Sequence, residues 1–317
     1  MQSKAKDITG TKEFGMFLAF LILFIFCSVF LNNFITGSNL QNLSRQIALL
    51  TILAVGEAFV VITAGIDLSV GSMIALTGVL TAIFFSQFHI PLILAIPMVM
   101  IISLLVGYYH GLLITRFKVP PFVATLGTLG IAKGLALVIT EAQPKPVLSS
   151  FLNFLGNGKF LGLFIPVYIA LIVIVVSILI MKYSLFGRYV YSIGSNYEAS
   201  RLSGVKVRRV QITAYMISAL LAGVTGILYA GYLREGSPRT GGAYELYAIA
   251  AVVIGGCSLM GGEGKIIGVV IGASIMQLIQ NALGLSDISS FWQDAVVGAV
   301  VVGAVVLDSI RQKRITI

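Results

Sequence analysis

The sequence predicts an all-α integral membrane protein of about ten transmembrane helices, with both termini in the cytoplasm. Hydrophobic residues form 58% of the 317-residue chain, charged residues form 10%, and the mean hydropathy is +1.01. A soluble core cannot bury so much apolar surface. Apolar runs of about 17 to 25 residues recur along the chain, and a helix of that length crosses a bilayer. The sequence does not show the short alternating segments that are typical of membrane barrels.

Ten apolar runs can be placed in order. The first follows a basic segment, but it is longer than the apolar part of a signal peptide and no suitable cleavage site follows, so we expect a membrane anchor. Loops account for the rest, so residues 1–317 are expected to form a single transmembrane domain. The predicted spans are 14–31, 47–63, 71–86, 91–115, 120–140, 166–181, 210–232, 246–259, 265–284 and 290–307.

Three of these spans contain glycine pairs spaced four residues apart. This spacing places both glycines on one helix face, where another backbone can approach closely. The pairs favour a compact helical bundle, and some of them could lie at the seam of a dimer. They are Gly107 and Gly111, Gly130 and Gly134, and Gly268 and Gly272.

The basic residues set the predicted orientation. With a cytoplasmic N-terminus, fifteen of the 21 Lys and Arg residues fall on the cytoplasmic side, five fall outside, and Lys133 lies within a span. This bias follows the positive-inside rule. The formal net charge of +9 therefore reports membrane topology, and no nucleic-acid partner is expected. The five external residues are Arg45, Lys145, Lys159, Arg234 and Arg239.

The cytoplasmic loop 183–210 is longer and more polar than the others. A short helix fits its middle, opened by a side-chain cap at Ser195 or Asn196 and closed at Gly204. An ordinary basic loop that holds the topology explains its charge. Its small residues instead suggest a surface that another protein approaches closely. Two external loops, 143–166 and 234–245, either cover the bundle or contact an external partner.

Residues for catalysis are not grouped in this sequence. His89 and His110 have no Cys, Asp or Glu neighbours at the spacing of metal ligands, and we expect both to be interfacial. The glycine-rich stretch 255–265 does not match a phosphate-binding loop, because Leu259 stands where that loop requires glycine. We therefore expect a non-enzymatic chain without a metal, a bound cofactor or a nucleotide site.

Several ionisable residues lie where lipid disfavours them. Glu57 and Lys133 fall well inside predicted spans, where each charge costs about 2.5 to 3.5 kcal/mol, so both should face the bundle interior or a watery cavity. An ion pair between them is the simplest hypothesis. They could stitch helices together, or they could line a path for a solute.

Asp67 lies in the stretch GIDLSVGS, between two spans that are predicted to be short. The joining segment should therefore lie below the membrane surface, packed in protein or lining a cavity. Gly65 can end the first helix, and the Asp67 carboxylate can accept hydrogen bonds from the amide of Ser69 or Val70 to start the next. A structural cap and a position on a solute path both fit this residue.

The sequence resembles the permease subunits of ribose-type ABC sugar importers of bacteria, from about residue 40 to the C-terminus. The resemblance rests on GIDLSVGS with the following TGVLTA, on PPFVATLGTLGIAKGLALVIT, on FGRYVYSIGSNYEASRLSGVKV, on GGAYELYAIAAVVIGGCSLMGGEGKIIG and on WQDAVVG, in the expected order. Two positions depart from the pattern: Tyr247 stands where related chains often have aspartate, and Lys133 where arginine is common. These departures bear on cargo specificity.

The resemblance implies a multi-pass permease of the bacterial inner membrane with the fold of the vitamin-B12-importer type. Its expected partners, besides membrane lipid, are a second permease copy in a homo- or heterodimer, a cytoplasmic tandem-cassette ATPase that holds ATP and Mg²⁺, and a periplasmic or lipid-anchored sugar-binding protein. Within loop 183–210 it implies an ATPase-coupling segment. The residues assigned to that segment are Gly187, Arg188, Asn196, Glu198, Ala199, Arg201, Leu202, Ser203 and Gly204.

The predicted function is inward transport of a monosaccharide, ribose or a similar sugar or polyol, by alternating access driven by the separate ATPase. The alternative is an ion-coupled secondary transporter that uses Glu57 or Asp67 as its ion site. The candidate residues for the translocation pathway or the helix break are Glu57, Asp67, Ser69, Gly71, Lys133 and Glu245.

Overall fold

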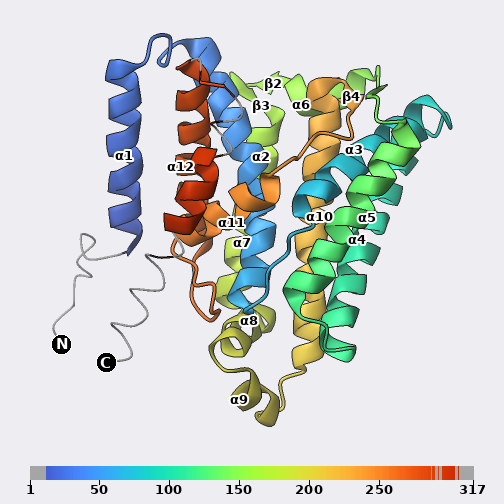
Figure 1. Cartoon of the computed structure of the whole chain (residues 1–317), viewed down its shortest axis with the longest axis vertical. Helices are drawn as coiled ribbons and strands as arrows, with labels where there is room; N and C mark the ends of the chain where they lie inside the picture. The colour runs from blue at the N-terminus through green and yellow to red at the C-terminus, as the bar shows by residue number, and fades with distance from the viewer. Residues whose placement is uncertain (1–11, 287, 290–291, 293–294, 304–305, 307–317) are drawn as a thin grey trace.

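Long apolar helices build the bundle (Figure 1). The structure, a computed structural model, describes residues 12–286, 288–289, 292, 295–303 and 306. Within these residues, seven helices are long and apolar enough to cross a membrane, and α3 (Val70–Ser86) and α11 (Tyr244–Ile254) are shorter apolar helices. The seven are α1 (Lys12–Phe30), α2 (Gly37–Ile62), α4 (Leu92–Arg116), α5 (Pro121–Thr140), α7 (Ile165–Tyr183), α10 (Val207–Leu233) and α12 (Ile266–Leu285).

These nine helices coincide with the first nine predicted spans, with two differences in length. Helix α2 begins at Gly37 and not near residue 47, because Thr36 caps it with a side chain that accepts from the Asn39 amide. Helix α11 ends at Ile254 and not at 259, because Gly255 and Gly256 follow Ile254. The tenth span, 290–307, and the terminal segments assigned to the cytoplasm lie partly or wholly outside the described residues.

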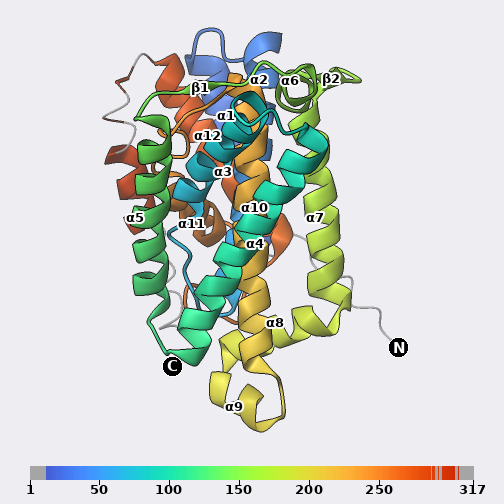
Figure 2. The same cartoon turned by 90° about the vertical axis from the view of Figure 1, so that its right-hand side faces the viewer.

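Helix α10 runs through the middle of the bundle and packs against α2, α3, α4 and the short helix α6 (Ser150–Asn157) (Figures 1 and 2). Gly107 and Gly111 make its contact with α4 possible, because a Cβ at either position would collide with the α10 backbone at Tyr215, Met216 or Ile212. Gly268 and Gly272 do the same between α12 and α11. By contrast, the described structure places nothing within 4 Å of a Cβ built at Gly130 or Gly134 on α5.

The chain between α2 and α3 turns back into the bundle. After Ile62 the segment 63–69 is not helical, and it rises along α2 to the start of α3, well above the end of α2 (Figures 1 and 2). Ala64 has φ +62°, and a Cβ at Gly65 would collide with the Tyr215 hydroxyl. The predicted helix break therefore lies inside the protein. The reason given from the sequence was wrong for α2, because this helix has 26 residues and is not short.

Short elements close the two ends of the bundle. At one end lie α6 (Ser150–Asn157) and two small antiparallel sheets, in which β1 (Lys145–Pro146) pairs with β4 (Glu235–Gly236) and β2 (Lys159–Phe160) pairs with β3 (Leu163–Phe164). At the other end α8 (Leu185–Ser195) and α9 (Tyr197–Leu202) project from the bundle (Figure 1). We call these the β-strand end and the α9 end.

Candidate functional site

Asp67 is the centre of a buried polar cluster at the helix break. Its Oδ1 accepts hydrogen bonds from the Ser69 amide at 3.0 Å and the Ser69 hydroxyl at 2.6 Å, and its Oδ2 accepts one from the Ser218 hydroxyl on α10 at 3.0 Å. The Asp67 amide donates to Oε1 of Glu57 on α2 at 3.0 Å. All four residues are 0% exposed. The expected hydrogen bond from the Ser69 amide to Asp67 is therefore present, just before the first turn of α3, and the cluster joins α2, α3 and α10.

His110 and Tyr215 complete this cluster. Nδ1 of His110 lies 4.0 Å from Oδ2 of Asp67, and the His110 ring meets the Tyr215 ring edge-on at 6.1 Å between centroids. Both nitrogens of His110, the Tyr215 hydroxyl and Oε2 of Glu57 are buried and make no hydrogen bond with the residues that the structure describes. These polar groups are costly to leave unpaired at such a place.

The interfacial position predicted for His110 is wrong. The residue is 0% exposed, because Gly107 and Gly111 on its own helix let α4 lie directly against α10. Tyr215 and Ser218 were not predicted as site residues at all. Isolated hydroxyls on a long apolar helix are common, so nothing in the sequence separates these two from the others. The position of His89 in an exposed turn is as predicted.

The predicted ion pair between Glu57 and Lys133 is also wrong. Glu57 faces Asp67 inside the bundle, whereas Lys133 is exposed on α5 and lines a cavity together with Glu245 of α11. Helix α5 packs mainly against α3 and α4, which keeps it away from α2.

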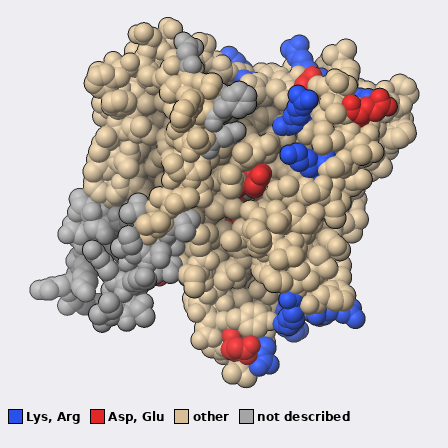
Figure 3. Space-filling model, viewed as in Figure 1, with Lys and Arg blue, Asp and Glu red and all other residues tan. Residues whose placement is uncertain are grey.

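This α3–α5 cavity has a volume of about 330 Å³. It lies between α3, α5, the turn 238–243 and the first turn of α11, and it is lined by charges of both signs from Lys133, Arg239 and Glu245. Cavities of about 300 to 1,000 Å³ are typical of small-molecule sites. Figure 3 shows acidic atoms near mid-height on this face, with basic atoms slightly above and to their right.

Gly71 sets the shape of the α3–α5 cavity. A Cβ at this position would collide with Oε2 of Glu245 and with the carbonyl oxygen of Gly241. Gly241 itself has φ +80°, a conformation that favours glycine. The two glycines therefore allow the first turn of α3 to lie against the turn before α11. The structure thus divides the predicted pathway residues: Glu57, Asp67 and Ser69 form the buried cluster, and Gly71, Lys133 and Glu245 line the cavity.

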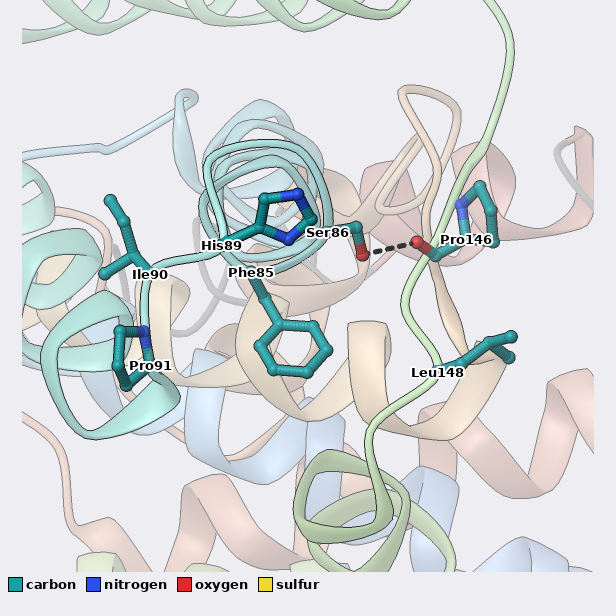
Figure 4. Close-up of a pocket in the computed structure, with 7 residues that line it drawn as sticks. All are labelled: Phe85, Ser86, His89, Ile90, Pro91, Pro146 and Leu148. Atoms are coloured by element: carbon teal, nitrogen blue, oxygen red, sulfur yellow. Dashed lines mark hydrogen bonds between the residues drawn. The ribbon is translucent and has the colours of Figure 1, made fainter.

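A second hollow, of about 440 Å³, lies at the β-strand end between the end of α3 and β1 (Figure 4). Its lining is apolar except for Ser86 and His89, and the Ser86 hydroxyl donates to the Pro146 carbonyl at 2.8 Å, which ties α3 to β1. This hollow offers an apolar surface and few groups that could hold a polar solute.

The segment assigned to coupling forms the α9 end. The Asn196 side chain accepts from the Ala199 amide at 2.9 Å and caps α9, and Gly204, with φ +83°, follows its last turn. Both ends of the predicted short helix are therefore confirmed. Gly187 lies where α8 turns away from α7, and a Cβ there would collide with the Ile180 and Met181 carbonyls.

The other residues assigned to coupling are exposed. Leu202 is 77% exposed, and Glu198 and Arg201 form an exposed ion pair at 2.8 Å. A large apolar side chain on a projecting, capped helix is typical of a docking surface. The exposed residues of this surface are Arg188, Asn196, Glu198, Ala199, Arg201, Leu202, Ser203 and Gly204.

The glycine-rich loop 255–265 joins the α9 end to the helix break. The Gly262 amide donates to the Ile62 carbonyl at 2.9 Å, and the Tyr191 hydroxyl on α8 donates to the Gly264 carbonyl at 2.8 Å. A Cβ at Gly194 would collide with the Ile62 carbonyl and the Gly262 amide. The glycines of this loop thus serve close packing against α2 and α8.

The chain is similar to known membrane permeases over most of its length. The family described as "Branched-chain amino acid transport system / permease component" matches residues 39–305. The chain belongs to this permease family. The match covers every element described above from α3 to α12, and with seven membrane-spanning candidates it makes the chain a multi-pass membrane permease.

Individual relatives extend over nearly the whole permease. It is 38% identical to the ribose import permease protein RbsC of Haemophilus influenzae over 92% of each chain. It is 40% identical to the ribose import permease protein RbsC of Bacillus subtilis, over 94% of this chain and 92% of the relative. It is 35% identical to the L-arabinose transport system permease protein AraH of Escherichia coli, over 95% and 92%. No solved structure matches the chain.

Proposed function

We propose that the chain is the membrane-spanning subunit of an ATP-driven importer that carries a monosaccharide across the bacterial inner membrane. The observation that carries this proposal is identity of 35 to 40% with ribose and arabinose permeases over more than nine tenths of the chain. The family description names amino acids, but the full-length relatives named above are sugar permeases. A pentose or a similar sugar or polyol is therefore the proposed cargo.

In this proposal the complete chain has ten spans with cytoplasmic termini, as in the vitamin-B12-importer type of fold, and the α3–α5 cavity belongs to the pathway. Lys133 supports this assignment, since an exposed amine at the middle of α5 is disfavoured in lipid and needs water or protein around it. Gly130 and Gly134, one turn of α5 apart, leave the same helix open to close approach. A second permease copy facing α5 would enclose the cavity.

We assign the proposed partners to the two ends of the bundle. The α9 end would dock on a cytoplasmic tandem-cassette ATPase, with Leu202 and the capped start of α9 at the contact. The β-strand end would face the periplasm and receive sugar from a periplasmic or lipid-anchored binding protein. ATP and Mg²⁺ belong to the ATPase, and the permease itself makes and breaks no bond.

Alternating access assigns distinct tasks to the two groups of pathway residues. The buried cluster holds the helix break in one arrangement, because the Asp67 carboxylate links α3 to α10 while its amide links α3 to α2. The cavity offers cationic and anionic groups that can hydrogen-bond sugar hydroxyls. An ion-coupled transporter that uses Glu57 or Asp67 is not favoured, because the full-length relatives are ribose and arabinose permeases and the Asp67 carboxylate already accepts three hydrogen bonds from Ser69 and Ser218.

The proposal is tested in proteoliposomes that contain the permease, its ATPase and its binding protein. Uptake of labelled D-ribose or L-arabinose should require ATP on the ATPase side and should not respond to a proton or sodium gradient. Uptake by the permease alone, driven by an ion gradient, would contradict the proposal. The control is the same complex with an ATPase variant that binds ATP but does not hydrolyse it.

A further inference from the structure

A further cavity lies on the other side of α11 from the α3–α5 cavity. It has a volume of about 290 Å³ and lies between α2, α11 and α12. We call it the α11–α12 cavity. Its polar lining consists of Gln46, Tyr244, Tyr247, Gln277, Gln280 and Asn281.

The chemistry of this lining selects against ions. Among the residues that the structure describes, no Asp, Glu, Lys, Arg or His lines the α11–α12 cavity. This contrasts with the α3–α5 cavity, which holds Lys133, Arg239 and Glu245. A phosphate or carboxylate ligand would need cationic donors, and a cation would need carboxylates. An apolar ligand would leave the amides unpaired.

Amides and phenols together suit a ligand with many hydroxyl groups. Each amide side chain offers two donors and an acceptor, so it can meet a hydroxyl in either role. A tyrosine ring gives an apolar face with a polar tip. These are the groups that an uncharged sugar or polyol needs, because most of its carbons carry both a C–H bond and a hydroxyl.

One amide that lines the cavity has a donor left unpaired by the residues that the structure describes. Nε2 of Gln280 is buried and has no hydrogen-bond partner within the described residues. Asn281, its neighbour, is held instead in a reciprocal pair with Asn39 of α2, with N to O distances of 3.1 and 2.8 Å. Gln277 is 3% exposed, one turn before Asn281 on the same helix. The wall is therefore fixed by Asn281, while the donor of Gln280 remains to be satisfied.

The first turn of α11 separates the two cavities. Tyr244 lines the α11–α12 cavity and the adjacent Glu245 lines the α3–α5 cavity. The Tyr244 hydroxyl is hydrogen-bonded to the Tyr229 hydroxyl of α10 at 2.5 Å, which fixes this turn against the central helix. A ligand on one side of the turn would therefore lie next to the pathway.

We propose that the α11–α12 cavity is a second binding site for an uncharged sugar or polyol, with Gln277 and Gln280 as its hydrogen-bonding residues. The site rests on the proposed function, because the ligand is taken to be the transported sugar itself. It adds a specificity element to the permease, beside the pathway cavity and apart from any external binding protein.

The test compares sugars that differ by one hydroxyl in the complete reconstituted transporter. Initial uptake rates of D-ribose, L-arabinose and their 2-deoxy and 5-deoxy analogues are measured for the unsubstituted protein, Gln277→Met and Gln280→Met. The same binding protein delivers every sugar, so its selectivity cancels in the comparison between variants. Gln143→Met, in an exposed loop, is the matched control.

For at least one analogue, the preference for the full sugar should fall about three- to tenfold in Gln280→Met or Gln277→Met, as expected for one lost hydrogen bond. A merely structural role would lower all rates by a common factor. Equal preference ratios in both variants and the unsubstituted protein would overturn the site. If a methionine variant does not insert, Gln280→Asn and Gln46→Met are measured in its place and judged by the same ratio.

This experiment also separates the two proposals. If the unsubstituted complex takes up neither sugar in an ATP-dependent way, the proposed function fails, and the site falls with it. If the unsubstituted complex transports and no ratio changes in any variant, the second site alone is refuted.

Discussion

Replacing Asp67 tests whether its carboxylate acts as a structural acceptor. In Asp67→Ala, the Ser69 amide and the Ser69 hydroxyl lose their acceptor inside the protein, and Ser218 can turn back to its own helix. Two buried donors left unpaired cost about 1 to 3 kcal/mol each, so the variant should lose about 2 to 6 kcal/mol. That is a large part of a net stability of about 5 to 15 kcal/mol.

Asp67→Asn keeps the acceptor. Its Oδ1 can still accept from Ser69, and its new amide can donate to the Ser218 hydroxyl, which is able to accept. We therefore expect a loss below about 1 kcal/mol for the asparagine variant. Ser218→Ala is the matched control, because it removes one partner of the carboxylate and leaves both bonds from Ser69.

The assay is thermal denaturation of the purified permease in detergent, followed by uptake in proteoliposomes. At about 2 °C per kcal/mol, the alanine variant should lower the apparent Tm by about 4 to 12 °C, and the asparagine variant by less than about 2 °C. Uptake should be lost with alanine and kept with asparagine. An asparagine variant that melts normally but does not transport would refute the structural reasoning, because the charge itself would then be required.

Three further changes follow from the packing and the surface. Gly107→Val should prevent stable folding, because the new side chain would force α4 away from the α10 backbone. Gly127→Ala should fold normally, because the structure describes nothing within 4 Å of a Cβ at that position. Size-exclusion profiles of the two variants in detergent test this difference. Arg45→Lys should lower the free energy of unfolding by about 2 to 3 kcal/mol, because lysine cannot keep both the hydrogen bonds to Asn157 and Asn42 and the stacking on two rings, and an unchanged Tm would contradict it. Arg201→Glu should leave insertion intact, abolish uptake and free ATP hydrolysis from dependence on sugar; normal uptake in vesicles would remove α9 from the coupling surface.

Several helices could be predicted because each depends on a local property of the sequence. An apolar run of sufficient length is enough to place α4, α5 and α12, and a side-chain acceptor followed by glycine is enough to bound α9. The start of α2 was misplaced, since its first turns are polar and carry the external residue Arg45, which is buried against aromatic rings. Hydropathy detects apolar side chains, so it finds the apolar part of α2 although that part is covered by protein, and it misses the polar first turns.

The candidate site was predicted only in part, because its partners come from distant helices. Asp67 and Ser69 could be joined from spacing, since the bond between them is local. The pairing of Glu57 with the Asp67 amide depends on the chain turning back after α2, and the burial of His110 depends on how closely α4 meets α10. Neither the pairing of Glu57 nor the burial of His110 can be predicted from the charge or hydropathy of the residue itself.

The glycine-rich loop 255–265 has a mechanical consequence. Its backbone touches the last residue of α2 on one side and α8 on the other, through Ile62, Gly194 and Tyr191. Apart from the Tyr191 hydroxyl, these contacts are made by backbone atoms, which leave little room for α8 to move relative to the end of α2. The loop therefore forms a short strut between α8 and the end of α2, where the segment 63–69 with the buried Asp67 begins.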